Sequence, residues 1–346
     1  MMRTGTWMLL VVSLGACGPD KPANTGGGEA SDAAAPSATV TPTAKGTATA
    51  TSAPASSEDT AKGMRLLEGS DLPGARAAFE AALKKNPKDA DATYYLAVTL
   101  ERSGDKAGAE KGYKDALKLK PDLDEAVTNL AAMYVDAGRW DEAIALLRPA
   151  SIRKPADVGL RTNLALALAG KGDVAGATLE FDAAVKAAPN DAMLLFTYGH
   201  WLGANKQTEA AIVKLKAART AAGDQTDLLA AIGHELLLLR SVADCIQTFD
   251  KVIATRDGAA ARTERALCKI AAKDDAGAIA DLDAATKKEP GYALAHYWLG
   301  MRYGVAKKWP DTIRELEAYL KLEPQGPKAK SAQDAIAAAK KASGVK

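Results

Sequence analysis

The chain has 346 residues, of which 47% are hydrophobic, 25% charged and only 5% aromatic. Its formal net charge of +2 gives no large basic field for nucleic-acid phosphates, which argues against a nucleic-acid partner. The helix-favouring residues Ala, Leu, Lys, Asp and Glu dominate after residue 60, which predicts an all-α fold. The longest apolar run, Trp7 to Leu14, falls far below the roughly 20 residues that a membrane-spanning helix needs.

Residues 1–16 have the layout of a secretory signal peptide. Arg3 precedes the apolar run from Trp7 to Leu14, and small residues follow. The sequence Leu14-Gly15-Ala16-Cys17 resembles the bacterial lipobox, in which the cysteine thiol receives diacylglycerol. The resemblance implies that Cys17 begins the mature protein and carries its lipid, so that the membrane is contacted through this anchor alone. An ordinary signal peptide with a chance cysteine is the alternative.

Residues 17–58 are expected to form the lipidated end and a disordered tether. Ala, Thr, Pro, Ser and Gly prevail there, and Val40 is the only sizeable aliphatic side chain, so the stretch cannot bury a core. Such a chain spans about 35 Å by flexible-chain scaling. Gly18 follows the cysteine where an inner-membrane lipoprotein of well-studied proteobacteria has Asp, which by analogy favours the outer membrane, facing the periplasm.

A motif of the form Ala-x3-Phe-x2-Ala-x4-Pro recurs with a period of 34 residues. Its first copy is Ala75, Phe79, Ala82 and Pro87, and three further copies keep this register up to Pro189. The fifth and sixth copies replace the proline with Gly223 and Asp257, the seventh begins one residue early, and the eighth ends at Pro324. A small residue precedes the motif in every copy: Gly63, Ala97, Ala131, Ala165, Gly199, Gly233, Ala266 and Gly300.

This pattern resembles the tetratricopeptide repeat family. Small residues stand where two antiparallel helices come closest, the large residue fills the space beside them, and proline ends the second helix. The resemblance implies a right-handed solenoid of about eight helical hairpins over residues 59–326. Residues 327–346 contain an alanine-rich amphipathic stretch from Ala329 to Lys341, which predicts a capping helix and a short tail.

The family resemblance also implies that the first helix of each hairpin lines a concave groove that binds a protein or an extended peptide. The candidate groove residues are Tyr95, Asn129, Asn163, Thr197, His200, His234, Trp298 and Met301. Asn129 and Asn163 resemble the asparagine ladder with which related superhelices bind a peptide backbone, because a carboxamide both donates and accepts. The alternative is that both belong to an Asn-Leu-Ala string that is common in such repeats.

The histidines and cysteines suggest two further features. His200 and His234 occupy the same place in consecutive repeats, about 8 to 10 Å apart if their helices pack directly. Zinc needs three or four ligands and His296 stands elsewhere in its repeat, so we expect no metal site. Cys245 and Cys268 fall on adjacent predicted helices, where they either form a disulfide or pack separately as small buried residues.

The sequence indicates no catalytic centre and no cofactor. The nearest approach to a phosphate loop, Gly170-Lys171-Gly172, is interpreted as a turn between helices whose glycines take positive φ. We therefore expect a lipid-anchored, non-enzymatic scaffold of the cell envelope that resembles pilotins and outer-membrane assembly lipoproteins and assists a pilus or secretion machine. The alternative is a structural scaffold or peptide-binding receptor without an assembly role.

Overall fold

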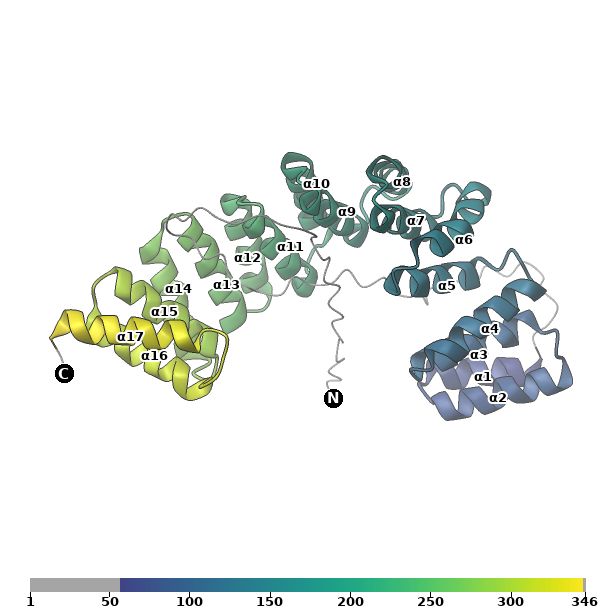
Figure 1. Cartoon of the computed structure of the whole chain (residues 1–346), viewed down its shortest axis with the longest axis horizontal. Helices are drawn as coiled ribbons and strands as arrows, with labels where there is room; N and C mark the ends of the chain where they lie inside the picture. The colour runs from purple at the N-terminus through teal and green to yellow at the C-terminus, as the bar shows by residue number, and fades with distance from the viewer. Residues whose placement is uncertain (1–56, 345–346) are drawn as a thin grey trace, which may run out of the picture. The chain divides into compact units, whose positions relative to one another are not determined.

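The computed structural model describes residues 57–344, so the signal peptide, Cys17 and nearly all of the tether lie outside the described residues. Within this range the chain forms seventeen α-helices and no strand, which confirms the expected all-α fold. The chain divides into two compact units, here called unit 1 (residues up to Pro189) and unit 2 (residues from Asn190). Each unit consists of consecutive antiparallel helices joined by short turns (Figure 1).

Unit 1 contains four hairpins. Their helices are α1 (Glu58–Glu68), α2 (Leu72–Lys85), α3 (Ala90–Arg102), α4 (Lys106–Leu119), α5 (Asp124–Asp136), α6 (Trp140–Arg153), α7 (Val158–Lys171) and α8 (Val174–Ala187).

Unit 2 contains four more hairpins and a final single helix. Its helices are α9 (Ala192–Ala204), α10 (Thr208–Ala221), α11 (Thr226–Leu238), α12 (Val242–Thr255), α13 (Ala259–Ala271), α14 (Asp275–Lys288), α15 (Ala293–Val305), α16 (Trp309–Leu322) and α17 (Ala329–Ser343).

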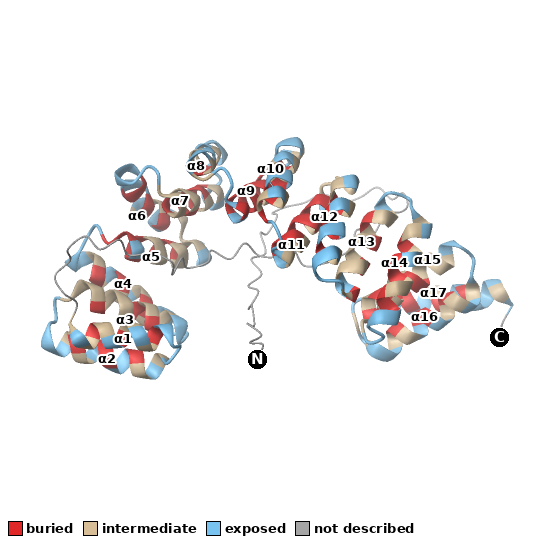
Figure 2. Ribbon diagram, turned by 180° about the vertical axis from the view of Figure 1, so that it is seen from behind, coloured by how far each residue is buried: buried red, intermediate tan, exposed pale blue. Residues whose placement is uncertain are grey.

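The repeated motif forms the inside of every hairpin. Ala75, Phe79 and Ala82 are all fully buried, and their counterparts along the chain are buried as well. The small residue of the first helix faces the large residue of the second: a Cβ added to Gly63 would lie 2.5 Å from the Phe79 ring, closer than atoms can approach. Buried residues accordingly concentrate where paired helices meet (Figure 2).

The prolines of the motif mark the ends of second helices, as expected. Helix α2 ends at Lys85, two residues before Pro87, and α8 ends at Ala187, two residues before Pro189. Where proline is absent, the helices end at the equivalent place: α12 ends at Thr255, two residues before Asp257. Proline therefore reinforces this boundary without being required for it.

The turn inside each hairpin places one residue in the left-handed backbone region. The residues are Ser70, Gly104, Gly138, Gly172, Lys206, Arg240, Lys273 and Lys307, with φ between +57° and +87°. The sequence-based interpretation is thus right for Gly172 and wrong for Gly170, which lies inside α7. Gly170 is small for another reason, since an added Cβ would lie 2.5 Å from the Trp140 indole.

The last helix caps the array as expected. Helix α17 buries Ala332, Ile336 and Ala339 at helical spacing, and the first two pack with Tyr297 and Tyr319 of the last hairpin. The Tyr297 hydroxyl hydrogen-bonds Ser331 Oγ at 3.0 Å. None of the helices between residues 57 and 344 is long and apolar enough to cross a bilayer.

Candidate functional site

Three of the predicted groove residues lie in unit 1. Tyr95 and Asn129 are half-buried, whereas Asn163 is only 4% exposed. The Tyr95 ring stacks on Phe79 with ring centroids 5.8 Å apart. Asn129 of α5 donates hydrogen bonds from Nδ2 to the hydroxyls of Tyr94 (3.1 Å) and Tyr113 (3.3 Å). The structure therefore buries Asn163, and it gives Asn129 a bonding role between helices α3, α4 and α5.

This tyrosine network is held in one protonation state. The Tyr113 hydroxyl is fully buried and donates to Glu101 Oε2 at 2.5 Å. Burial raises the pKa of Tyr113 and of Tyr94 well above the usual tyrosine value, with nearby carboxylates adding to the effect at Tyr113. Both hydroxyls stay protonated at physiological pH, so the Asn129 amide meets two neutral oxygen acceptors.

In unit 2, the candidates Trp298 and Met301 of α15 are half-buried, whereas Thr197 of α9 is 8% exposed. Trp298 packs against two hydrophobic clusters, the first around Leu282 and Leu299 and the second around Leu316 and Tyr319. Its indole meets the Tyr297 ring edge-on with centroids 5.2 Å apart. Met301 borders the second of these clusters. Part of each side chain thus supports the core, and the rest is open to a ligand.

The histidines pair with glutamates instead of with each other. His200 Nδ1 lies 2.8 Å from Glu235 Oε1, which joins α9 to α11. His234 Nδ1 lies 3.7 Å from Glu264 Oε2, which joins α11 to α13. His296 Nδ1 lies 2.8 Å from Glu315 Oε2, which joins α15 to α16. Within residues 57–344, no cluster of three or more potential metal ligands occurs.

Each pairing favours the charged imidazolium. The hydrogen bond with Glu235 raises the pKa of His200 above its usual value, with burial opposing the shift. The carboxylate of Glu264 raises the pKa of His234, and the hydrogen bond with Glu315 raises that of His296. The glutamates are the partners that sequence reasoning missed. Glu235 follows His200 by one repeat plus one residue, so comparing residues offset by about one repeat length would have suggested this pair.

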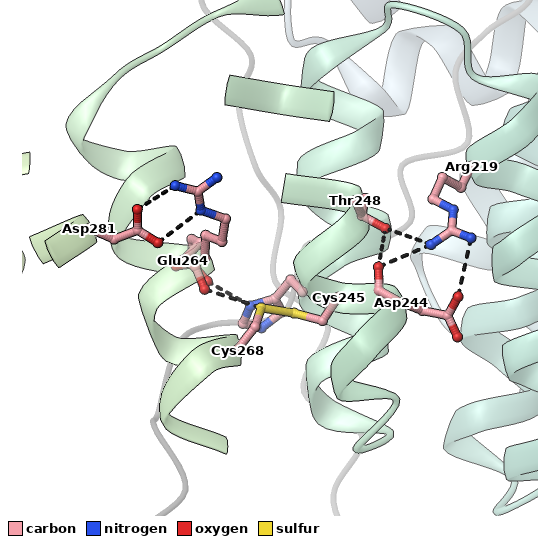
Figure 3. The surroundings of a disulfide bond; sticks show 9 residues. Arg219, Asp244, Cys245, Thr248, Glu264, Cys268 and Asp281 are labelled. Atoms are coloured by element: carbon pink, nitrogen blue, oxygen red, sulfur yellow. Dashed lines mark hydrogen bonds and ion pairs between the residues drawn. A yellow bond between two sulfur atoms is a disulfide. The ribbon is translucent and has the colours of Figure 1, made fainter. Parts of the chain in front are cut away.

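A disulfide joins Cys245 of α12 to Cys268 of α13 (Figure 3). Their Cα atoms are 6.0 Å apart, within the range that disulfides adopt, and both residues are fully buried. Glu264 lies one helical turn before Cys268 on α13. The covalent link therefore connects the sixth hairpin to the seventh beside one of the histidine–glutamate pairs.

The succession of antiparallel helical hairpins places the described part of the chain in the class of helical-repeat solenoids. The tetratricopeptide repeat family model matches residues 60–124 and 129–192. Yeast Tom70 is similar in structure, with a TM-score of 0.50 and 16% identity over 86% of this chain, which spans only 66% of Tom70. A tetratricopeptide repeat protein from Parabacteroides merdae also has a TM-score of 0.50 and 16% identity, over 71% of this chain and 97% of that protein.

The fold is therefore a solenoid of tetratricopeptide hairpins, as expected from the motif. The two matched segments cover nearly all of the described part of unit 1, and unit 2 likewise consists of consecutive helical hairpins. Such stacked hairpins are the architecture of a protein-interaction scaffold, because they present an extended surface of helix faces.

Proposed function

We propose that this protein is a lipid-anchored scaffold that binds other proteins in the cell envelope and assists the assembly or docking of an envelope complex. The observation that carries the proposal is a series of partly exposed side chains on the first helices of the hairpins. Six of the eight candidates keep part of their surface open: Tyr95, Asn129, His200, His234, Trp298 and Met301. Aromatic and methionine side chains held on a rigid framework are typical anchors of protein interfaces.

The site of binding is tested by photo-crosslinking. A photoreactive phenylalanine analogue at Met301, on a first helix, should capture a protein of the envelope machinery, such as a secretin or pilus component, identified by mass spectrometry. The matched control is the same analogue at Val213, which is 64% exposed on the second helix α10. Capture from Val213 alone would contradict the proposed face. Capture of soluble or cell-wall proteins alone would contradict the assembly role and favour the structural scaffold.

The membrane anchor is tested separately. Leu14-Gly15-Ala16-Cys17 supports lipidation of Cys17, which lies outside the described residues. Cys17→Ser should abolish labelling of the protein by radioactive palmitate, because serine offers no thiol for lipid transfer. Ser37→Ala, within the tether, is the control and should retain the label. Palmitate labelling that survives Cys17→Ser would refute the anchor.

A further inference from the structure

All three histidines of the chain lie on first helices of unit 2, and each faces a glutamate of another helix. The first two pairs form a continuous series across three hairpins. His200 of α9 meets Glu235 of α11, and the residue just before Glu235, His234, meets Glu264 of α13. The three hairpins that contain α9, α11 and α13 are thus linked in order by two histidine–glutamate contacts.

The buried carboxylate of Glu235 depends on His200 for a compensating positive charge. Glu235 is only 4% exposed, and a buried carboxylate is costly unless a cation compensates it. His200 is the cationic partner that Glu235 contacts in the structure. Glu315 differs, because Arg314 Nη2 also lies 2.9 Å from it and compensates its charge at any pH. The contact between His296 and Glu315 should therefore depend less on protonation of the histidine than the contact between His200 and Glu235 does.

Two buried polar atoms without partners accompany the second pair. Among the described residues, His234 Nε2 and Glu264 Oε2 are enclosed and make no hydrogen bond. Glu264 Oε2 is also the carboxylate oxygen nearest to the His234 ring, 3.7 Å away. This contact thus relies on charge attraction between the imidazolium and the carboxylate rather than on a close hydrogen bond. Loss of the histidine proton would remove that attraction.

We propose that the pairs His200–Glu235 and His234–Glu264 form a proton-operated clasp that holds the first three hairpins of unit 2 together and thereby regulates the binding face. With both imidazoles charged, the clasp is closed and α9, α11 and α13 keep their spacing. When both are neutral, Glu235 is left as a buried charge and the three helices loosen. The regulation of binding rests on the proposed function, because His200 and His234 are themselves candidates for partner contact.

The charges around the imidazole rings of His200 and His234 favour the protonated form of both histidines. Glu235 of α11 is the ionisable group that acts on His200, and none from α10 does so among the described residues. His234 is influenced by Glu264 of α13 and by Glu235 on its own helix, and by no group of α12. The cations of α13 are engaged elsewhere: Arg262 binds Asp257, and both Arg265 and Lys269 bind Asp281. Among residues 57–344, the groups that shift the pKa of either histidine include no cation.

The sign of the pH dependence follows from the raised histidine pKa values. A histidine whose pKa is higher in the folded chain contributes stability that is fully present below its unfolded value of about 6.5. This stability is lost as the pH rises through the folded value. Unit 2 should therefore be held most tightly below about pH 6.5 and should loosen as the pH rises through the folded pKa values of His200 and His234.

The experiment uses the full chain and compares its melting temperature at pH 6 and pH 8 with the titration of each histidine by NMR. The three imidazole resonances are assigned from single His→Gln variants. We expect His200 and His234 to titrate above 6.5, and the melting temperature of the chain to be higher at pH 6 by about 2 to 4 °C. Glu235→Gln should lower the pKa of His200 and reduce the melting difference. His200→Gln, which keeps a neutral hydrogen-bonding group at both pH values, should also reduce it.

The matched control is Glu317→Gln, a glutamate of the same unit that binds Lys340 and no histidine. It should leave the melting difference unchanged. Identical melting at pH 6 and pH 8 in the unaltered chain, or titration of both histidines at or below 6.5, would overturn the clasp. An equal effect of Glu317→Gln would also overturn it.

The stability and titration measurements need no partner, so they remain valid if no envelope partner is found. Regulation is tested by crosslinking from Met301 at the two pH values, where we expect at least a threefold higher yield at pH 6. Equal yields, with the melting difference present, would refute regulation and leave the clasp as a stability device. Absence of any crosslink would count against the proposed function alone.

Discussion

The two units achieve the same hairpin stacking by different means. The repeats of unit 1 keep the motif proline at Pro87, Pro121, Pro155 and Pro189, and the left-handed turn residue is glycine in three of its four hairpins. Unit 2 has Gly223 and Asp257 at two of the proline positions, and the left-handed residue inside each of its four hairpins carries a side chain. It also holds every histidine of the chain and the disulfide.

Unit 2 has additional bonds where its motif is weakest, between the sixth and seventh hairpins. The disulfide joins α12 to α13 there, and Arg265 of α13 binds both Asp250 of α12 and Asp281 of α14. Asp281 is 3% exposed. Burial acts to raise its pKa, but hydrogen bonds from Arg265 and Lys269 outweigh burial and lower it, so the acid stays charged. A repeat can therefore depart from the motif, as at Asp257, where a disulfide and ion pairs hold the neighbouring hairpins together.

The sharpest test of this comparison is removal of the disulfide. The link closes a loop with a sequence separation of 23 residues, for which the chain-entropy estimate of stabilisation is about 3 kcal/mol. Replacing Cys245 and Cys268 by Ala should therefore destabilise unit 2 by about that amount and leave unit 1 unchanged. Hydrogen exchange resolved by helix, measured by mass spectrometry, separates the units. A reductant should destabilise unit 2 in the unaltered chain to the same extent and should have no effect on the double variant. Faster hydrogen exchange confined to unit 1 would contradict a stabilising role of the disulfide in unit 2.

A smaller loss is expected from crowding one hairpin. A Cβ at Gly233 would lie 2.6 Å from the Phe249 ring, which is buried and cannot easily move. Gly233→Ala should cost about 2 kcal/mol of unfolding free energy through overpacking, measured by urea denaturation followed by circular dichroism. Gly291→Ala is the matched control, since no atom lies within 4 Å of a Cβ there. Equal effects of the two substitutions would show that close packing at Gly233 is not the cause.

The smallest effects come from exchanging turn residues between the units. Gly172 has φ +87° with nothing within 4 Å of an added Cβ, so Gly172→Ala should cost about 1 kcal/mol from backbone strain alone. Lys273 occupies the equivalent turn of unit 2 with φ +62°, so Lys273→Gly should relieve strain and stabilise by about the same amount. Urea denaturation measures both changes. If both substitutions changed the free energy of unfolding in the same direction, backbone strain would not distinguish the two turns.

Several features were predictable because they depend on residues close in sequence. The 34-residue motif located all eight hairpins, and its proline positions gave the ends of the second helices. The amphipathic pattern after Pro327 predicted α17. One local signal was overlooked. In the turns after Gly104 and Gly172, an aspartate accepts a hydrogen bond from the backbone of a glycine three residues later, and the spacing recurs in the sequence.

The helical repeat, its period and its capping helix follow directly from the amino-acid sequence, because periodic burial and helix termination act within one repeat length. Which polar side chains stay exposed, by contrast, depends on contacts between residues far apart in the sequence. Asn129 and Asn163 occupy equivalent repeat positions, yet one bonds two tyrosines and the other is buried. His200 and His234 pair with glutamates of other helices rather than with each other. These choices depend on side-chain contacts between hairpins, which repeat position alone does not specify.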